Sequence, residues 1–125
     1  GDFHMRVKRD RTQVRVILDQ QPPVNSCRPA VDPLFHSIAD CYGKNSLGLI
    51  LTGMGQDGAD GAQRLHDCGA TVIAQDRESS VVWGMPGEVV KRKLADRVLP
   101  ISQLGQEVNR LVHAGRTARP LAVTQ

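Results

Sequence analysis

Residues 47–51, LGLIL, form a short and continuous apolar run that leads directly into the glycine-rich segment TGMGQDGADG at residues 52–61. An uninterrupted run of this length is typical of a strand that is buried on both faces of a sheet. Beyond the first glycines, apolar residues recur at helical spacing from Ala59 to Leu65. The segment therefore predicts a strand, a tight turn and a helix, a unit typical of α/β proteins with a parallel sheet.

The remaining elements follow the same alternation of strand and helix. The expected elements are a hairpin with strands at 4–9 and 14–18, helices at about 31–42, 59–68, 86–94 and 101–112, and strands at 47–51, 71–75 and 97–101. Short joints between them indicate parallel crossovers. The predicted fold class is therefore α/β: a doubly wound, mainly parallel sheet with flanking helices and an N-terminal β-hairpin. Residues 113–125 lack periodicity and are expected to form a disordered tail.

The composition is that of an ordinary globular domain. The chain has 125 residues, of which 40% are hydrophobic and 23% are charged, enough for one domain with a core. The net charge of +3 comes from scattered basic residues, so no nucleic-acid partner is expected. No apolar run approaches the roughly 20 residues of a membrane span, so no membrane insertion is expected. Three widely spaced cysteines predict reduced thiols, no metal site and a cytoplasmic protein.

The glycine-rich segment allows a nucleotide-binding interpretation. Residues Gly53–Gly58 fit the pattern G-x-G-x-x-G between a strand and a helix, and Asp76 follows the next strand about 20 residues on. Asp57 argues against this interpretation, because a carboxylate in the turn would repel a pyrophosphate. A dinucleotide site is therefore the weaker hypothesis.

Two other interpretations of this segment depend on its carboxylates. Asp57 and Asp60 could approach one cation, but no glutamate follows at the spacing of a calcium loop, and acidic side chains in a first helical turn are favourable without any metal. Alternatively, Asp57 lies at the carboxyl end of a strand, where functional groups of α/β sheets gather, and could orient a catalytic histidine. The residues alone leave Asp57 between this role and that of a helix cap.

Three segments together resemble the C-terminal half of chemotaxis protein-glutamate methylesterases, the CheB family: LGLILTGMGQDGADG, AQDRESSVVWGMPGEVV and RVLPISQLGQEV. The opening GDFHM and the segment NSCRPAVDPLFHSIA are also similar to that family. The resemblance covers residues 1–112. It implies a hydrolase of γ-glutamyl methyl esters, and of some glutamine amides, on the cytoplasmic helices of methylated chemoreceptors. It implies a Ser-His-Asp mechanism and no cofactor.

The resemblance also implies roles for individual residues. The family's aspartate in TGMGxDG matches Asp57, while Met54, Gly53, Gly55 and His4 match positions that border the active site. The family's serine turn, G-A-S-T-G-G, and its histidine loop, Q-H-M-P, do not occur in this sequence. We therefore expect this chain to supply only the aspartate, and the full-length protein to carry a receiver domain as well. The alternative is a non-catalytic remnant or a partner-binding α/β module.

Overall fold

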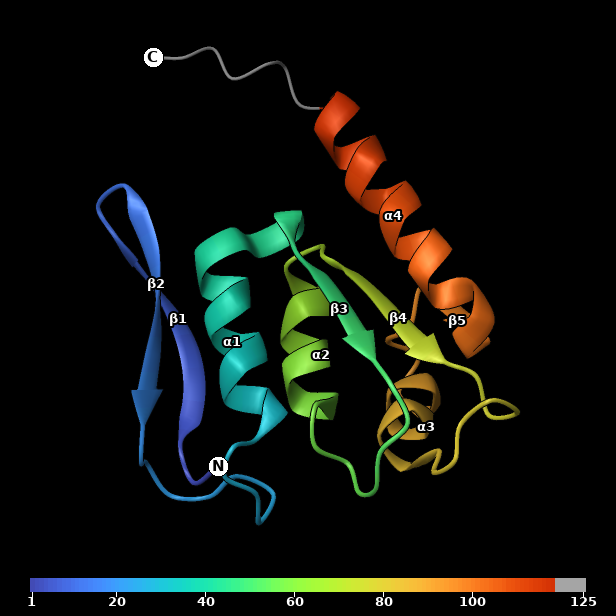
Figure 1. The fold of residues 1–125 in the computed structure, drawn as a ribbon, viewed down its shortest axis with the longest axis horizontal. Coiled ribbons are helices and arrows are strands. Elements are labelled where there is room, and N and C mark those ends of the chain that lie inside the picture. Colours follow the sequence, from blue (N-terminus) through green and yellow to red (C-terminus); the bar gives the residue numbers. More distant parts are fainter. Residues whose placement is uncertain (119–125) are drawn as a thin grey trace.

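The structure is a computed structural model that describes residues 1–118 of the chain. In chain order the elements are β1 (His4–Asp10), β2 (Gln13–Asp19), α1 (Val31–Tyr42), the 3₁₀ helix η1 (Gly43–Asn45), β3 (Leu47–Ile50), α2 (Ala59–Asp67), β4 (Thr71–Gln75), α3 (Gly84–Lys91), β5 (Arg97–Leu99) and α4 (Ile101–Ala118) (Figure 1). The predicted strands and helices are all present.

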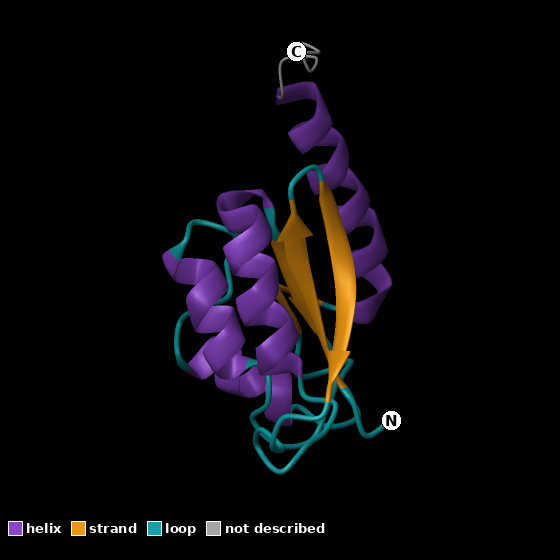
Figure 2. Cartoon of the chain, turned by 90° about the vertical axis from the view of Figure 1, so that its left-hand side faces the viewer, coloured by secondary structure: helices purple, strands orange, loops and turns teal. Residues whose placement is uncertain are grey.

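The central sheet is parallel and has the strand order β3-β4-β5. Helices α1, α2 and α3 cover one face of this sheet and α4 covers the other (Figure 2). Because each strand is joined to the next through a helix, all three strands end at the same edge of the sheet. The structure confirms the predicted doubly wound α/β fold.

The core has two apolar layers, one on each face of the sheet. Leu65 of α2, Val72 of β4 and Val89 of α3 belong to the first layer, and Ile73 and Leu104 belong to the second. Neighbouring residues of β4 point to opposite faces, so Val72 and Ile73 serve different layers. Full burial of each such side chain contributes about 1.5–3 kcal/mol.

The predicted hairpin is confirmed and forms a two-stranded sheet of its own. Its strand β1 lies against α1: the amide of Val7 donates to Ser37 Oγ at 2.9 Å, and the Cys41 thiol donates to the Val7 carbonyl at 3.8 Å. Side chains of α1 therefore satisfy the outer edge of β1, which protects it from pairing with other strands.

The last helix runs beyond its predicted end. Residues 113–118 were expected to belong to a disordered tail, but they continue α4 up to Ala118; residues 119–125 lie outside the described part of the chain. The stretch 113–118 contains no proline, so nothing in it prevents the continuation of the helix. Glu107 anchors α4 by accepting hydrogen bonds from Arg110 and Arg97, which hold the pKa of its carboxyl below the usual value.

Candidate active site

Three loops meet at the edge where the parallel strands end. They are the glycine-rich loop 51–58 between β3 and α2, the loop 76–83 after β4, and the loop 20–30 that leads from the hairpin into α1 (Figure 1). In an open α/β sheet this edge is where functional groups gather. The site is therefore built from segments that lie far apart in the sequence.

Asp57 lies in the glycine-rich loop, but its side chain reaches the start of α1. Its Oδ2 accepts a hydrogen bond from the amide of Val31 at 2.7 Å, and its Oδ1 accepts one from the amide of Asp32 at 3.3 Å. The residue before the helix, Ala30, offers no side chain to cap it. Asp57 therefore supplies the cap from another element, where the positive end of the helix dipole favours a carboxylate.

Asp32 returns this interaction. It lies in the first turn of α1, and its Oδ1 accepts the amide of Gly61 in the first turn of α2 at 2.8 Å. Asp57, from the loop before α2, thus caps α1, and Asp32, from α1, caps α2. The two residues are only 3% (Asp32) and 8% (Asp57) exposed. Between them lies the side-chain amide of Asn25, which donates to Asp32 Oδ2 at 2.8 Å and to Asp57 Oδ1 at 3.1 Å.

Amide donors, rather than cations, hold the two carboxylates in the described part of the chain. No ion pair found among residues 1–118 includes Asp32 or Asp57. Each carboxylate oxygen can accept about two hydrogen bonds. The Oδ1 atom of Asp57 accepts two, from Asn25 and Asp32, whereas Oδ2 accepts one, from Val31. Oδ2 therefore retains capacity for a further donor, such as the N–H of an imidazole.

The glycine-rich loop is clamped to the segment that follows β4. The amide of Gly53 donates to the carbonyl of Val82 at 2.9 Å, and the carbonyl of Gly53 accepts the amide of Met85 at 2.9 Å. Gly84 packs so closely that a Cβ there would lie 2.8 Å from the Gly53 carbonyl oxygen. The backbone of the predicted border residue Gly53 is thereby fixed.

Two other glycines of the loop adopt backbone conformations that other residues rarely reach. Gly55 has φ = 87° and Gly58, directly before α2, has φ = 93°. Both values lie in the left-handed region, which glycine enters without steric cost. These glycines place Asp57 between them at the turn into the helix.

Gln75 ties the two clamped loops together from inside the protein. Its Oε1 accepts the amide of Thr52 at 2.8 Å and its Nε2 donates to the carbonyl of Ser79 at 2.8 Å, while the residue is 2% exposed. Neither Gln75 nor Asn25 was predicted from the sequence to have a role. The signal that could have identified Gln75 is its position as a polar residue at the end of a buried strand.

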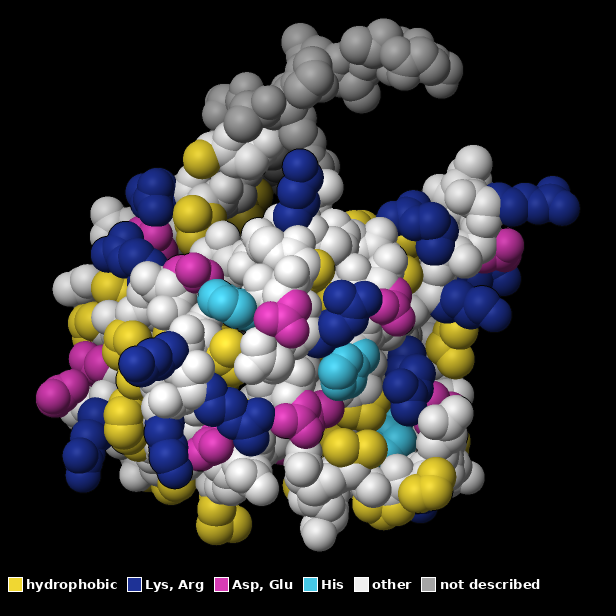
Figure 3. Space-filling view, turned by 180° about the vertical axis from the view of Figure 1, so that it is seen from behind, with side chains coloured by type: hydrophobic (Ala, Val, Ile, Leu, Met, Phe, Trp, Pro, Cys, Tyr) yellow, Lys and Arg dark blue, Asp and Glu magenta, His cyan; other side chains and the backbone are white. Residues whose placement is uncertain are grey.

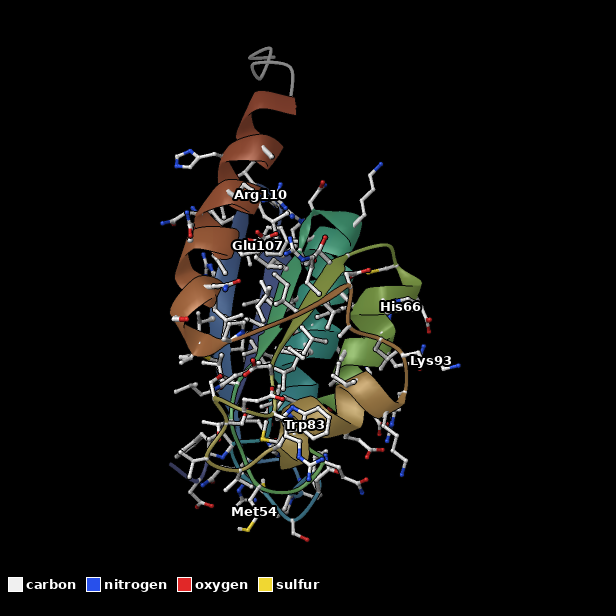
Figure 4. The ribbon with its side chains drawn as sticks, turned by 90° about the vertical axis from the view of Figure 1, so that its right-hand side faces the viewer. Met54, His66, Trp83, Lys93, Glu107 and Arg110 are labelled. Carbon is white, nitrogen blue, oxygen red and sulfur yellow. The ribbon has the colours of Figure 1, made fainter. Side chains whose placement is uncertain are left out.

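The other two predicted border residues differ in their surroundings. Met54 is 85% exposed at the tip of the glycine-rich loop, where Figure 4 shows its side chain pointing away from the body of the protein. His4 is fully buried; its Nε2 lies 3.0 Å from the carbonyl of Pro22 and its Nδ1 accepts the amide of Ala30 at 3.2 Å. His4 therefore stabilises the loop that carries Asn25 by bonding to its backbone, and its own hydrogen bonds go to Pro22 and Ala30 rather than to Asp57.

The described residues that donate hydrogen bonds to Asp57 include neither a serine nor a histidine, so they supply no nucleophile and no base. The three donors are the Asn25 side chain and the amides of Val31 and Asp32. The histidines of the two capping helices, His36 and His66, are exposed. The sequence expectation that this chain supplies the aspartate but not its catalytic partners therefore stays a prediction.

The backbone geometry disfavours a dinucleotide at this loop. A pyrophosphate needs free amides at the turn and at the helix start, but those of Gly53, Ala59 and Gly61 already donate to protein oxygens. Asp60, considered above as a cation ligand, instead pairs with Arg92 at 2.8 Å on the surface. Among the described residues no group of three or more metal-binding side chains comes together.

The sequence of this chain matches a known protein family. The model of the CheB methylesterase family matches residues 1–108. The chain belongs to the CheB methylesterase family. This confirms the resemblance found in the sequence.

Individual CheB relatives match most of this chain. The protein-glutamate methylesterase/protein-glutamine glutaminase of Maricaulis maris is 49% identical over 115 residues, which is 92% of this chain and 29% of the relative. That of Trichodesmium erythraeum is 48% identical over 112 residues, 90% of this chain and 32% of the relative. The CheB methylesterase catalytic domain of Thermotoga maritima superposes with a TM-score of 0.87 at 40% identity, covering 89% of this chain and 59% of that one. The chain thus spans about a third or less of the two curated relatives.

Basic and acidic side chains are interspersed over the face that Figure 3 shows. None of the described helices combines the length and the apolar character needed to cross a membrane.

Proposed function

We propose that this chain forms the aspartate-bearing part of a protein-glutamate methylesterase, in which Asp57 orients the catalytic histidine. The observation that carries the proposal is the buried Asp57 carboxylate at the carboxyl edge of the sheet, in a chain of the CheB methylesterase family. A serine and a histidine supplied by the rest of the complete enzyme would finish the catalytic group. Like its relatives, the complete enzyme would also act on glutamine side chains.

The chemistry assigned to Asp57 follows from the fixed position of its carboxylate. An acceptor-only anion that receives the histidine N–H holds one tautomer and stabilises the imidazolium. The histidine removes the serine proton as the serine oxygen attacks the ester carbonyl, and passes that proton to the departing methoxide, which leaves as methanol. Water then hydrolyses the acyl-enzyme and restores the serine. No cofactor is needed for these steps.

The proposed partner is a methylated chemoreceptor, whose cytoplasmic helices carry the glutamyl methyl esters, so we place the enzyme in the cytoplasm. Met54 and Val81, which are 85% and 92% exposed, project from the two clamped loops. Exposed apolar side chains beside a site are suited to contact a partner protein. A receiver domain in the full-length protein would regulate access to this edge.

Methanol release from methylated receptor tests the proposal. The complete enzyme should release methanol at rates far above background, whereas the 125-residue polypeptide alone should release none, because the nucleophile and its base are not part of the site described here. Adding the polypeptide to buffer without receptor is the control. Absence of methanol release by the complete enzyme would contradict the proposed function. Turnover by the polypeptide alone would contradict the assignment of the serine and histidine to other residues.

A further inference from the structure

We propose that Asn25 is a positioning residue for Asp57, whose side-chain amide sets the orientation of the carboxylate that receives the catalytic histidine. This inference rests on the proposed function and goes beyond it, because it assigns a role to a residue of the loop that precedes α1. Asn25 would not touch the substrate or the histidine. It would act through Asp57 alone.

The backbone around Asn25 is held in a tight turn. Val24 and Cys27 exchange two backbone hydrogen bonds, of 3.0 and 2.9 Å. Between them, Asn25 and Ser26 both have positive φ values, 53° and 62°. Two consecutive left-handed residues define a type I′ turn, in which asparagine is favoured at the first position. The turn thus presents the Asn25 side chain in one direction.

The same turn is anchored from behind. His4, fully buried, bonds to the carbonyl of Pro22 on one side of the turn and accepts the amide of Ala30 on the other. Both ends of the loop are therefore fixed to β1. An amide on an anchored turn can hold its acceptors in place, whereas one on a mobile loop would follow them.

The position of the amide determines which oxygen of Asp57 stays available. Asn25 Nδ2 donates to Asp57 Oδ1, which also accepts the amide of Asp32, so the capacity of this oxygen is filled. Oδ2 keeps one free acceptor position, which we assign to the histidine. A partial rotation of the carboxylate would displace this free acceptor position, and the Asn25 amide opposes such a rotation.

Asn25 also separates two buried negative charges. Its Nδ2 lies 2.8 Å from Asp32 Oδ2 and 3.1 Å from Asp57 Oδ1. Like charges that share one hydrogen-bond donor repel each other in a partly buried site, and the donor between them offsets this repulsion. Without the amide, Asp57 is expected to turn away from Asp32 and therefore away from the position that serves the histidine.

The position of Asn25 allows its role to be separated from folding. Asn25 itself is exposed, so truncating its side chain leaves no cavity in the core. Asn25→Gly keeps the positive φ at no steric cost and removes the amide. Asn25→Asp keeps the shape and the backbone preference but replaces both donors with a third carboxylate. Ser26→Gly is the matched control, since it changes the neighbouring left-handed residue of the same turn.

The test is steady-state methanol release by the complete enzyme with each variant. Asn25→Gly should lower kcat on the order of tenfold with KM unchanged, because only the orientation of the catalytic group is lost. Asn25→Asp should lower kcat at least as much, and Ser26→Gly should stay within about twofold of the unsubstituted enzyme. Unchanged kcat in both Asn25 variants would overturn the inference.

A double-mutant cycle distinguishes positioning from general support of the fold. If Asn25 acts through Asp57, then Asn25→Gly should cause no further loss of kcat in the Asp57→Asn background. If the double variant lost kcat by the product of the two single losses, Asn25 would act by a route other than Asp57, and the inference would be overturned. A large loss in Asp57→Asn combined with full activity of the Asn25 variants removes this inference but leaves the proposed function standing. Full activity of Asp57→Asn would instead remove the proposed function.

Discussion

At the scale of single residues, the pair Asp32 and Asp57 combines two tasks in one hydrogen-bonded group. Asp57 caps α1 and Asp32 caps α2, and each carboxylate is held by amide donors in the described structure. The capping stabilises the fold, whereas the free acceptor position on Asp57 Oδ2 has a role only in the proposed catalysis. Substitutions at the two positions should therefore differ in kind.

Asp32→Asn should destabilise the protein. The new amide group would face either the Gly61 amide or the Asn25 amide, so a buried donor would lose its acceptor, at a cost of about 1–3 kcal/mol in the free energy of unfolding. Denaturant unfolding measures this change. Asp40→Asn, on the same helix but in a surface pair with Arg64, should change it by less than about 1 kcal/mol. Equal effects of the two substitutions would contradict the capping role.

At the scale of elements, the clamp between the glycine-rich loop and the start of α3 keeps Asp57 at the edge of the sheet. A Cβ at Gly84 would lie 2.8 Å from the Gly53 carbonyl oxygen and 2.9 Å from the nitrogen and oxygen of Gly55. These are backbone atoms, so they cannot yield without moving the loop. The clamp thus couples the packing of α3 to the position of the Asp57 carboxylate.

Gly84→Ala should therefore lower both stability, by about 1–3 kcal/mol, and methanol release by the complete enzyme. Gly105→Ala is the control: this residue lies in α4, a Cβ there meets nothing within 4 Å, and alanine in a helix is more stable than glycine by about 0.5–1 kcal/mol. Thermal melts and initial rates for both variants check the prediction. If Gly84→Ala left both the stability and the rate of methanol release unchanged, the clamp would contribute to neither.

Elements were predicted well from the sequence where one local signal governs them. The strand Thr71–Gln75 was predicted with its observed bounds because it is a continuous apolar run bounded by polar residues. The end of α4 was predicted too early, because the apolar periodicity fades before the helix stops and a helix can continue without burying a face. Local pattern thus locates an element better than it locates its end.

At the scale of the whole molecule, the site joins loops that are separated by tens of residues. Asp57 was identified from the sequence because it lies in a distinctive motif, and its catalytic role remains a prediction. Asn25 and Gln75 were not identified, because their importance depends on hydrogen bonds across 32 and 23 positions of the chain. Such contacts exist only once the fold is formed. The position of Gln75 at the end of a buried strand is a signal for a buried polar role, but it does not name the partner, and an asparagine in a loop gives no such signal.

In the proposed enzyme, Asp57 orients the histidine of a methylesterase that this chain completes. The most direct test is the initial rate of methanol release by the complete enzyme carrying Asp57→Asn, with thermal melts alongside, because the amide also weakens the cap of α1. The equivalent change in a serine protease lowers turnover about 10⁴-fold. A methyl ester has a better leaving group, so we expect a loss on the order of 10²-fold here, roughly 2.7 kcal/mol of barrier.

Asp60→Asn, in the first turn of α2 directly after the loop that carries Asp57, is the matched control for that measurement. Its carboxylate is exposed and pairs with Arg92 on the surface, so its loss should change turnover by less than about threefold. We therefore expect a large loss of turnover for Asp57→Asn in a folded enzyme and almost none for Asp60→Asn. Near-full activity of Asp57→Asn together with a large loss in Asp60→Asn would contradict this expectation, and would place a different carboxylate in the active site.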